Sequence, residues 1–247
     1  MTSPPPPEAE SAPPPYISAN QIVAEDEVVQ PTILVISQHF IRAQSSVGAV
    51  LYELSQDITQ SSDGESKASL SRVVRGVRMS ASGAPRATQR SRHIYDLKRL
   101  PSLLANGFPY CLDATSRSAA AAGHLGLKTT SFPRTGAKIL RMESDKAGGS
   151  FPKGYKARRE TAKHNGSMFE LRKAHDHYEW VDSEGHRIAV EDHTTDHFQL
   201  IVTTPLSRPV IDALVASWCL KIWHDRIELS IGKPQGCEFT YYLTFLS

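Results

Sequence analysis

The stretch HYEWVDSEGHRIAVE, residues 177–191, has the pattern of a β-hairpin. Apolar side chains alternate with polar ones in its first part, through Tyr178 and Trp180, and again in its last part, through Ile188 and Val190. A period of two is typical of strands with one buried face, and the polar segment between the two parts contains a glycine suited to a tight turn. We therefore expect an antiparallel β-sheet built around this hairpin.

A second pattern, VIDALVASWCLKIW at residues 210–223, follows soon after the hairpin. Only Asp212, Ser217 and Lys221 interrupt its apolar surface. A helix without a polar face lies inside a protein or a membrane, and a membrane span needs about 20 apolar residues. This run is shorter and contains a lysine, so we predict a helix over about 207–224 that is buried in the protein.

Short strand-like segments separated by turn residues recur through the chain, and this spacing predicts a sandwich or a barrel. A helix with no polar face needs apolar contacts on every side, which a barrel closed around it supplies while leaving no free sheet edge. We predict a mainly β fold: a closed antiparallel β-barrel around one hydrophobic C-terminal helix, with a disordered N-terminal tail. The first strand is expected to be an edge strand or a docked segment. The predicted strands are 32–36, 50–54, 72–79, 93–98, 110–114, 125–130, 137–142, 154–161, 168–173, 177–181, 186–191 and 198–203, with polar loops over 56–71 and 80–90.

Composition divides the 247 residues into three parts. Residues 1–30 are rich in proline and acidic side chains and too poor in apolar ones to form a core, so we expect a disordered tail. Residues 31–230 are predicted to form the barrel domain. Residues 231–247 are a C-terminal extension that ends in an aromatic, strand-prone segment, which either adds a final strand or does not pair.

A short motif stands out in the tail. Pro13, Pro14, Pro15 and Tyr16 have the form of a PPxY ligand for WW domains. A polyproline helix loses little entropy on docking into an aromatic-lined groove, and the tyrosine fills a second pocket beside it. The alternative is a plain flexible tail, since four-residue motifs arise by chance in proline-rich segments.

Positive charge is concentrated in one region. The net charge of +2 and the pI near 8.4 do not argue for nucleic acid, but no Asp or Glu occurs between Lys67 and Arg92. This region is either a solvated loop rich in serine and arginine or a contact for anionic lipid, phosphate or an acidic partner. The candidate anion-binding residues are Arg72, Arg75, Arg78, Arg86, Arg90 and Arg92.

Catalytic chemistry has little support in the sequence. It contains no Gly-rich phosphate loop, nucleophile elbow or metalloprotease motif. His175 and His177 would lie on one face of a strand and, with a third ligand, could bind zinc; the alternative is that they are ordinary polar residues at a strand end. Glu191 and its acidic neighbours are expected to form a solvated turn. We expect no catalytic residue and no cofactor.

The three cysteines, Cys111, Cys219 and Cys237, are too few and too scattered for a disulfide framework or a zinc site, which favours a reducing compartment. The N-terminus resembles neither a signal peptide nor an Arg-rich transit peptide. We expect a cytoplasmic protein that is at most peripheral at membranes, with no transmembrane span and no nucleic-acid partner.

The motifs together resemble the tubby C-terminal-like superfamily, which includes the LURP-one-related proteins and many fungal domains of unknown function. The likeness covers residues from about 45 to 225. It implies a closed antiparallel barrel threaded by one hydrophobic C-terminal helix. Some members bind phosphoinositides or act at membranes, but the Lys/Arg pair that binds phosphoinositide in tubby proteins has no identifiable counterpart here. The residues that carry the likeness are 178–180, 182–185, 188–190, 200–202 and 209–223, with 51–54 and 93–97 similar to early strands of the fungal members.

Three hypotheses follow for function. The first is a non-enzymatic intracellular binding or adaptor module, whose barrel binds anionic phospholipid or a protein and whose tail binds a WW-domain protein through residues 13–16. The second is a zinc-dependent, hydrolase-like enzyme that uses His175 and His177. The third is an orphan structural barrel whose function lies in its tails.

Overall fold

The fold is described here from a computed structural model of the chain. Most of the predicted tail over 1–30, and all but the first residue of the predicted extension over 231–247, lie outside the residues that the structure describes. The described residues are 27–44, 49–60, 66–80, 82–101, 108–116, 119, 122–130, 136–143, 156–157, 166–175, 177–192 and 197–231.

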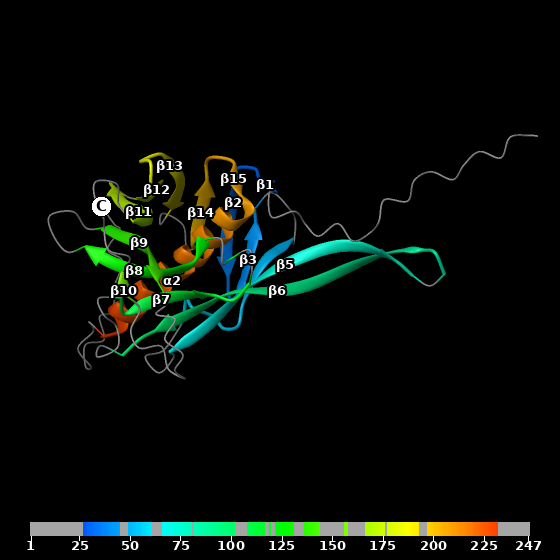
Figure 1. Cartoon of the computed structure of the whole chain (residues 1–247), viewed down its shortest axis with the longest axis horizontal. Coiled ribbons are helices and arrows are strands. Elements are labelled where there is room, and N and C mark those ends of the chain that lie inside the picture. The colour runs from blue at the N-terminus through cyan, green and yellow to red at the C-terminus, as the bar shows by residue number, and fades with distance from the viewer. Residues whose placement is uncertain are drawn as a thin grey trace, which may run out of the picture.

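The main sheet closes on itself, which confirms the predicted antiparallel barrel (Figure 1). It has thirteen strands, of which all but the short β10 (Lys156–Ala157) form the ring. Each ring strand pairs with the next along the chain, and the ring closes where β14 pairs with β2. The ring strands are β2 (Thr32–Ser37), β3 (Phe40–Ala43), β4 (Val50–Leu54), β5 (Lys67–Met79), β6 (Pro85–Arg99), β7 (Tyr110–Ala114), β8 (His124–Thr130), β9 (Gly136–Glu143), β11 (Ser167–Ala174), β12 (His177–Asp182), β13 (Arg187–Asp192) and β14 (Gln199–Val202).

The helix α2 (Arg208–Ile231) runs through the ring of strands, and every residue over 211–223 is buried (Figure 1). It is longer than the predicted 207–224. Residues after Trp223 are mostly polar, which suggested an end, but Ile227 lies four positions further on the same side and is fully buried. The apolar stripe that holds the helix in the barrel therefore continues for another turn.

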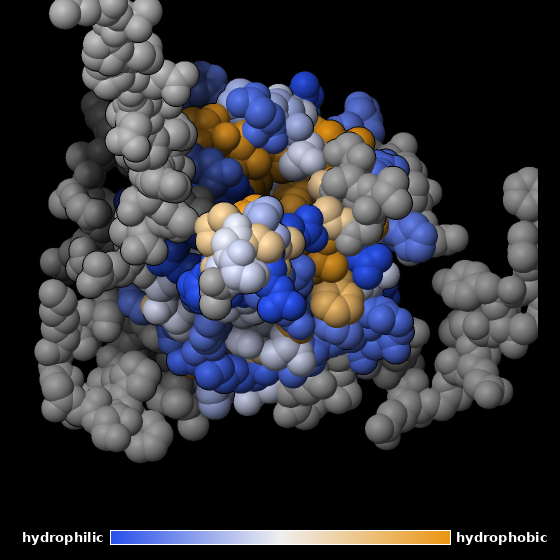
Figure 2. Space-filling view, turned by 90° about the vertical axis from the view of Figure 1, so that its right-hand side faces the viewer, coloured by the Kyte–Doolittle hydropathy of each residue, from blue (hydrophilic) through white to orange (hydrophobic). Residues whose placement is uncertain are grey.

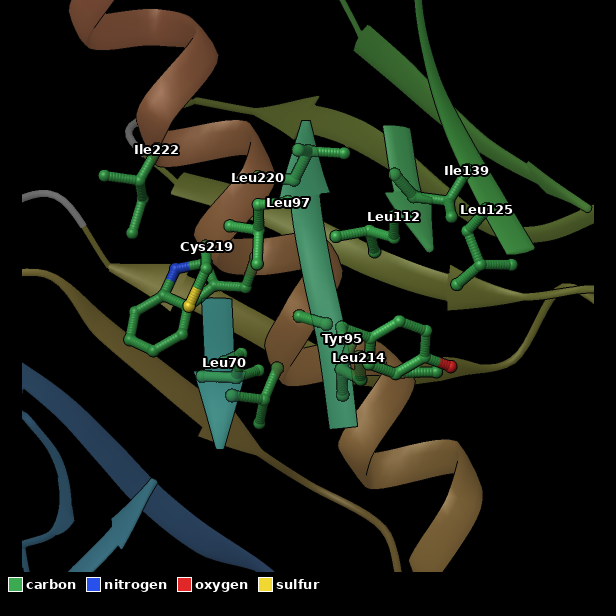
Figure 3. Close-up of a cluster of buried hydrophobic side chains, with 14 of the residues drawn as sticks. Leu70, Tyr95, Leu97, Leu112, Leu125, Ile139, Leu214, Cys219, Leu220 and Ile222 are labelled. Carbon is green, nitrogen blue, oxygen red and sulfur yellow. The ribbon is translucent and has the colours of Figure 1, made fainter. Parts of the chain in front are cut away.

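The core lies between the inner faces of the strands and α2. Figure 3 shows leucine, isoleucine and tyrosine side chains of β5 to β9 arranged around the helix. The largest fully buried side chains are Trp180, Trp218 and Trp223. Each large apolar side chain that is fully buried contributes about 1.5–3 kcal/mol relative to an exposed one, so the contact between helix and barrel dominates the stability of the fold.

Four details of the structure differ from the predicted fold. The segment over 32–36 is not an edge, because β2 pairs with both β14 and β3. The predicted loop over 56–71 ends before Lys67, where β5 begins. The short β3 was not predicted. Val28–Val29, within the predicted tail, form β1 and pair with β15 (Leu206–Ser207) just before the helix.

Strands β5 and β6 extend together beyond the barrel wall (Figure 1). β4 pairs with β5 only up to Arg72, and β7 pairs with β6 only from Tyr95. Residues 73–79 and 85–91 therefore pair only with each other, and they are called the arm below. The predicted loop over 80–90 is in fact the tip of this arm, with its turn closed by the hydrogen bond from Ser80 N to Ala84 O at 2.9 Å.

Candidate functional site

The arm has two different faces. Residues directly opposite each other in an antiparallel pair share a face, and neighbours along a strand alternate. Arg78 lies opposite Arg86, Val74 opposite Arg90, and Arg72 opposite Arg92. Five of the six predicted anion-binding residues thus lie on the same side of the β5–β6 pair, and the part of that side that belongs to the arm is called the arginine face. The arginine face consists of Val74, Gly76, Arg78, Arg86, Thr88 and Arg90.

The arginine face carries net positive charge. Arg78, Arg86 and Arg90 are exposed, and none of them forms an ion pair with any acidic side chain among the described residues. Like charges placed directly opposite each other destabilise a sheet by a few tenths of a kcal/mol to about 1 kcal/mol. The Arg78–Arg86 pair is therefore an arrangement that a bound anion would relieve, and guanidinium groups suit the planar, bidentate contacts that phosphate offers.

Arg72 does not belong to this surface, and its prediction as an anion ligand is corrected. It is the last β5 residue that pairs with β4, and its Nη1 lies 2.6 Å from Oδ2 of Asp212 on α2. Tyr52 O–H donates to the other carboxylate oxygen at 2.9 Å. Burial raises the pKa of Asp212 in spite of these partners, and burial together with the Asp212 carboxylate raises the pKa of Tyr52 well above its ordinary value.

Arg75 lies on the opposite face of the arm. Its side chain turns back toward the barrel, where Nη2 donates a hydrogen bond to the carbonyl oxygen of Val50 at 3.3 Å. Two exposed apolar residues, Val77 and Met79, follow it on that face. The basic surface of the arm is therefore formed by fewer arginines than the sequence suggested, but those that remain are aligned on one side.

A second polar cluster lies inside the barrel, near the C-terminal part of α2. Lys221 Nζ lies 3.0 Å from Oε1 of Glu191 and 3.0 Å from Oδ2 of Asp225, and 4.2 Å from the ring centre of Tyr178. Glu191 is fully buried, so its predicted place in a solvated turn is wrong. Burial alone would lower the pKa of Lys221, but the carboxylates of Glu191 and Asp225 raise this pKa above its ordinary value.

Tyr178, Lys221, Asp225 and His224 border a cavity of about 160 Å³. His224 Nδ1 lies 3.0 Å from Asp225 Oδ1. Burial alone would raise the pKa of Asp225, but the hydrogen bonds from His224 and Lys221 lower it below its ordinary value. Lys221 thus lies between two carboxylates, as a buried charge requires, and these contacts account for a lysine in the buried part of the helix.

The two histidines do not have the arrangement that the sequence predicted for them. His175 lies in the turn between β11 and β12 with φ of 45°, and His177 is the first residue of β12, so the two do not share a strand face. Within the described residues, which omit Asp176 and 193–196, no group of three His, Cys, Asp or Glu side chains is placed to hold a metal ion. The PPxY residues 13–16 lie outside the described part of the chain.

Fold and site together define a closed β-barrel with a buried central helix and a basic β-hairpin arm. Among the described residues, no helix combines the length and the apolar character needed to cross a bilayer. No family model and no curated protein matches the chain. Among solved structures, the protein AT5G01750 of Arabidopsis thaliana matches 76% of this chain and 90% of its own, with a TM-score of 0.38 and 11% sequence identity. At this similarity neither a family nor a function follows from the match.

Proposed function

We propose that the protein is a non-enzymatic binding module whose arm docks on the anionic headgroups of a phospholipid membrane. The observation that carries this proposal is the alignment of Arg78, Arg86 and Arg90 on one exposed face, in a region from Lys67 to Arg92 that contains no acidic residue. Charge of one sign on a protruding element attracts a surface of the opposite sign before contact is made.

The expected affinity is that of a peripheral, reversible contact. Each basic residue held near an anionic leaflet contributes about 1 kcal/mol, so the three exposed arginines contribute about 3 kcal/mol, or roughly 150-fold in affinity. The interaction between exposed charges is screened by salt. Binding should therefore weaken steeply as ionic strength rises.

The resemblance to the tubby-like superfamily suggests which lipid to test first. A closed barrel around a hydrophobic C-terminal helix is the architecture that the resemblance implies, and some members of that superfamily bind phosphoinositides. A phosphoinositide headgroup also carries several phosphates, which matches the clustering of arginines on one face.

Co-sedimentation of the full chain with vesicles tests the proposal. We expect binding to vesicles that contain phosphoinositide, none to neutral vesicles, and a loss of about 100-fold in affinity for the triple variant R78Q/R86Q/R90Q. A matched control removes the same charge from exposed positions outside the arm, through R172Q, K173Q and R187Q. Equal binding by wild type and the arm variant at low salt would overturn the proposal.

We also propose that the tail recruits a WW-domain protein through residues 13–16. In a fungal cell, HECT-type ubiquitin ligases would be natural partners, which would make the protein an adaptor or a substrate. The motif carries this proposal. Binding of the full chain to an immobilised WW domain should be lost with Tyr16→Ala and kept with the control Pro5→Ala; retention by the Tyr16 variant would contradict it.

A further inference from the structure

The face of the arm opposite the arginines exposes apolar side chains. Val77 is 62% exposed and Met79 is 63% exposed, and in the β5–β6 register they lie opposite Ala87 and Pro85. These four residues form one continuous surface near the tip, called the apolar patch below. Figure 2 views the molecule from the end that the arm reaches, and pale-orange apolar residues lie beside blue hydrophilic ones at the centre of that face.

Nothing else in the described part of the arm covers this patch. The strand edges next to it pair only with each other, and the hairpin turn at 80–84 lies beyond it. Arg75, the one charged residue on the same face, turns back to the Val50 carbonyl and so does not interrupt the patch. Leaving a valine or methionine in water instead of burying it costs about 1.5–3 kcal/mol, so the patch favours an apolar environment.

The arm is therefore amphipathic across its thickness. A helix with basic residues on one face and apolar side chains on the other lies in the plane of a membrane interface, with its apolar face about 5–10 Å deep at the boundary of headgroups and acyl chains. The same division of faces on a hairpin favours the same position. Arginine stems extend toward the phosphates while the backbone lies below them. Because the tip projects beyond the barrel, it reaches a flat surface before the barrel does (Figure 1).

We infer that the apolar patch inserts into the outer acyl region of an anionic bilayer while Arg78, Arg86 and Arg90 contact the phosphates above it. This inference rests on the proposed membrane function and deepens it. The ligand is then an intact bilayer surface and not a free headgroup. A soluble inositol polyphosphate meets the arginine face alone and should bind more weakly than a vesicle with the same headgroup.

A fluorescent label reports insertion directly. Met79→Cys places an environment-sensitive dye on the patch, and Thr88→Cys places the same dye on the arginine face. Both are made in a Cys237→Ser background, since Cys111 and Cys219 are buried. With phosphoinositide vesicles, we expect a shift to shorter wavelength at Met79→Cys and none at Thr88→Cys. Soluble inositol polyphosphate should shift neither label.

The double variant V77S/M79S provides a second readout. Both positions are exposed, so its thermal midpoint should equal that of the wild type. Its affinity for the vesicles should fall about tenfold or more, because two apolar side chains lose their burial.

The outcomes separate the two proposals. Vesicle binding that needs the arginines, with no shift at Met79→Cys, overturns insertion and leaves the proposed function standing. Absence of vesicle binding at low salt overturns both. A shift at Met79→Cys with an acidic polypeptide such as polyglutamate, and none with vesicles, overturns insertion in favour of an acidic protein partner.

Discussion

The ion pair between Arg72 and Asp212 offers a quantitative test of how α2 is held in the barrel. Asp212 is fully buried and Arg72 nearly so, with 2.6 Å between Nη1 and Oδ2. Removing one partner of a buried pair leaves the other charge uncompensated and costs about 3–5 kcal/mol. We therefore expect R72M alone and D212L alone each to lower the free energy of unfolding by about that amount.

The double variant should cost far less than the sum of its parts. Replacing a buried ion pair with apolar residues of similar volume is often neutral or stabilising by about 1–4 kcal/mol. The double variant also leaves the Tyr52 hydroxyl without its acceptor, which costs about 1–3 kcal/mol, so a triple variant with Y52F should recover that amount. The coupling between R72M and D212L is then expected to exceed about 3 kcal/mol.

Equilibrium unfolding in urea measures each free energy. A matched control is E170Q, which breaks the exposed pair with Arg172 and should cost less than about 1 kcal/mol. Additive effects of R72M and D212L, or single effects as small as the control, would refute the reasoning, because charges 2.6 Å apart in the interior must couple.

Two further variants test local packing and electrostatics. Gly126→Ala should destabilise the barrel by about 1–3 kcal/mol in urea unfolding, because the added Cβ would lie 2.6 Å from Met142 Sδ. The control is Gly76→Ala, whose Cβ would have its nearest contact at an ordinary 3.6 Å. An equal effect of the two substitutions would contradict the packing argument. The pKa of Asp225 is lowered from its ordinary value of 3.8. Its carboxylate therefore stabilises the folded protein at pH values above 3.8, and this stabilisation is lost as the pH falls through the pKa of the folded state. Asp225→Asn should therefore lower the urea midpoint at neutral pH and make no difference at acid pH below that value, whereas a constant difference across pH would exclude this linkage.

The hairpin and the helix could be predicted from sequence because their signals are local. The alternating pattern predicted two strands, and β12 and β13 lie within one residue of the predicted bounds. The buried face of β13 was predicted less well: a register shift follows Trp180, and Ala189 and Glu191 are fully buried, whereas Val190 is half-buried. The absence of a polar face over 210–223 implied full enclosure, and the closed ring provides it. Neither signal depends on which distant strands are neighbours.

The arm could not be predicted in the same way. Arg72 and Arg78 are the same residue type in the same strand, and six positions apart they have the same parity, so alternation places them on one face. The two arginines differ because the barrel wall ends between them. β4 pairs with β5 only up to Arg72, and β7 pairs with β6 only from Tyr95, so Arg78 lies beyond the wall. That boundary depends on strand pairing, which the residues of the arm do not encode by themselves.

The ion pair at the buried end of β5 nevertheless fixes the register of the exposed end. A slip of β5 by one residue would turn Arg72 out of the barrel and leave the Asp212 charge buried without its cation, at a cost of several kcal/mol. The same slip would move Arg78 to the side now occupied by Met79, and the arginine face and the apolar patch would mix. The strand register that places Arg72 beside Asp212 is therefore also the one that keeps the arginine face separate from the apolar patch. On this argument the ion pair serves the arm as well as the core, since it keeps the arginine face and the apolar patch on opposite sides of the arm.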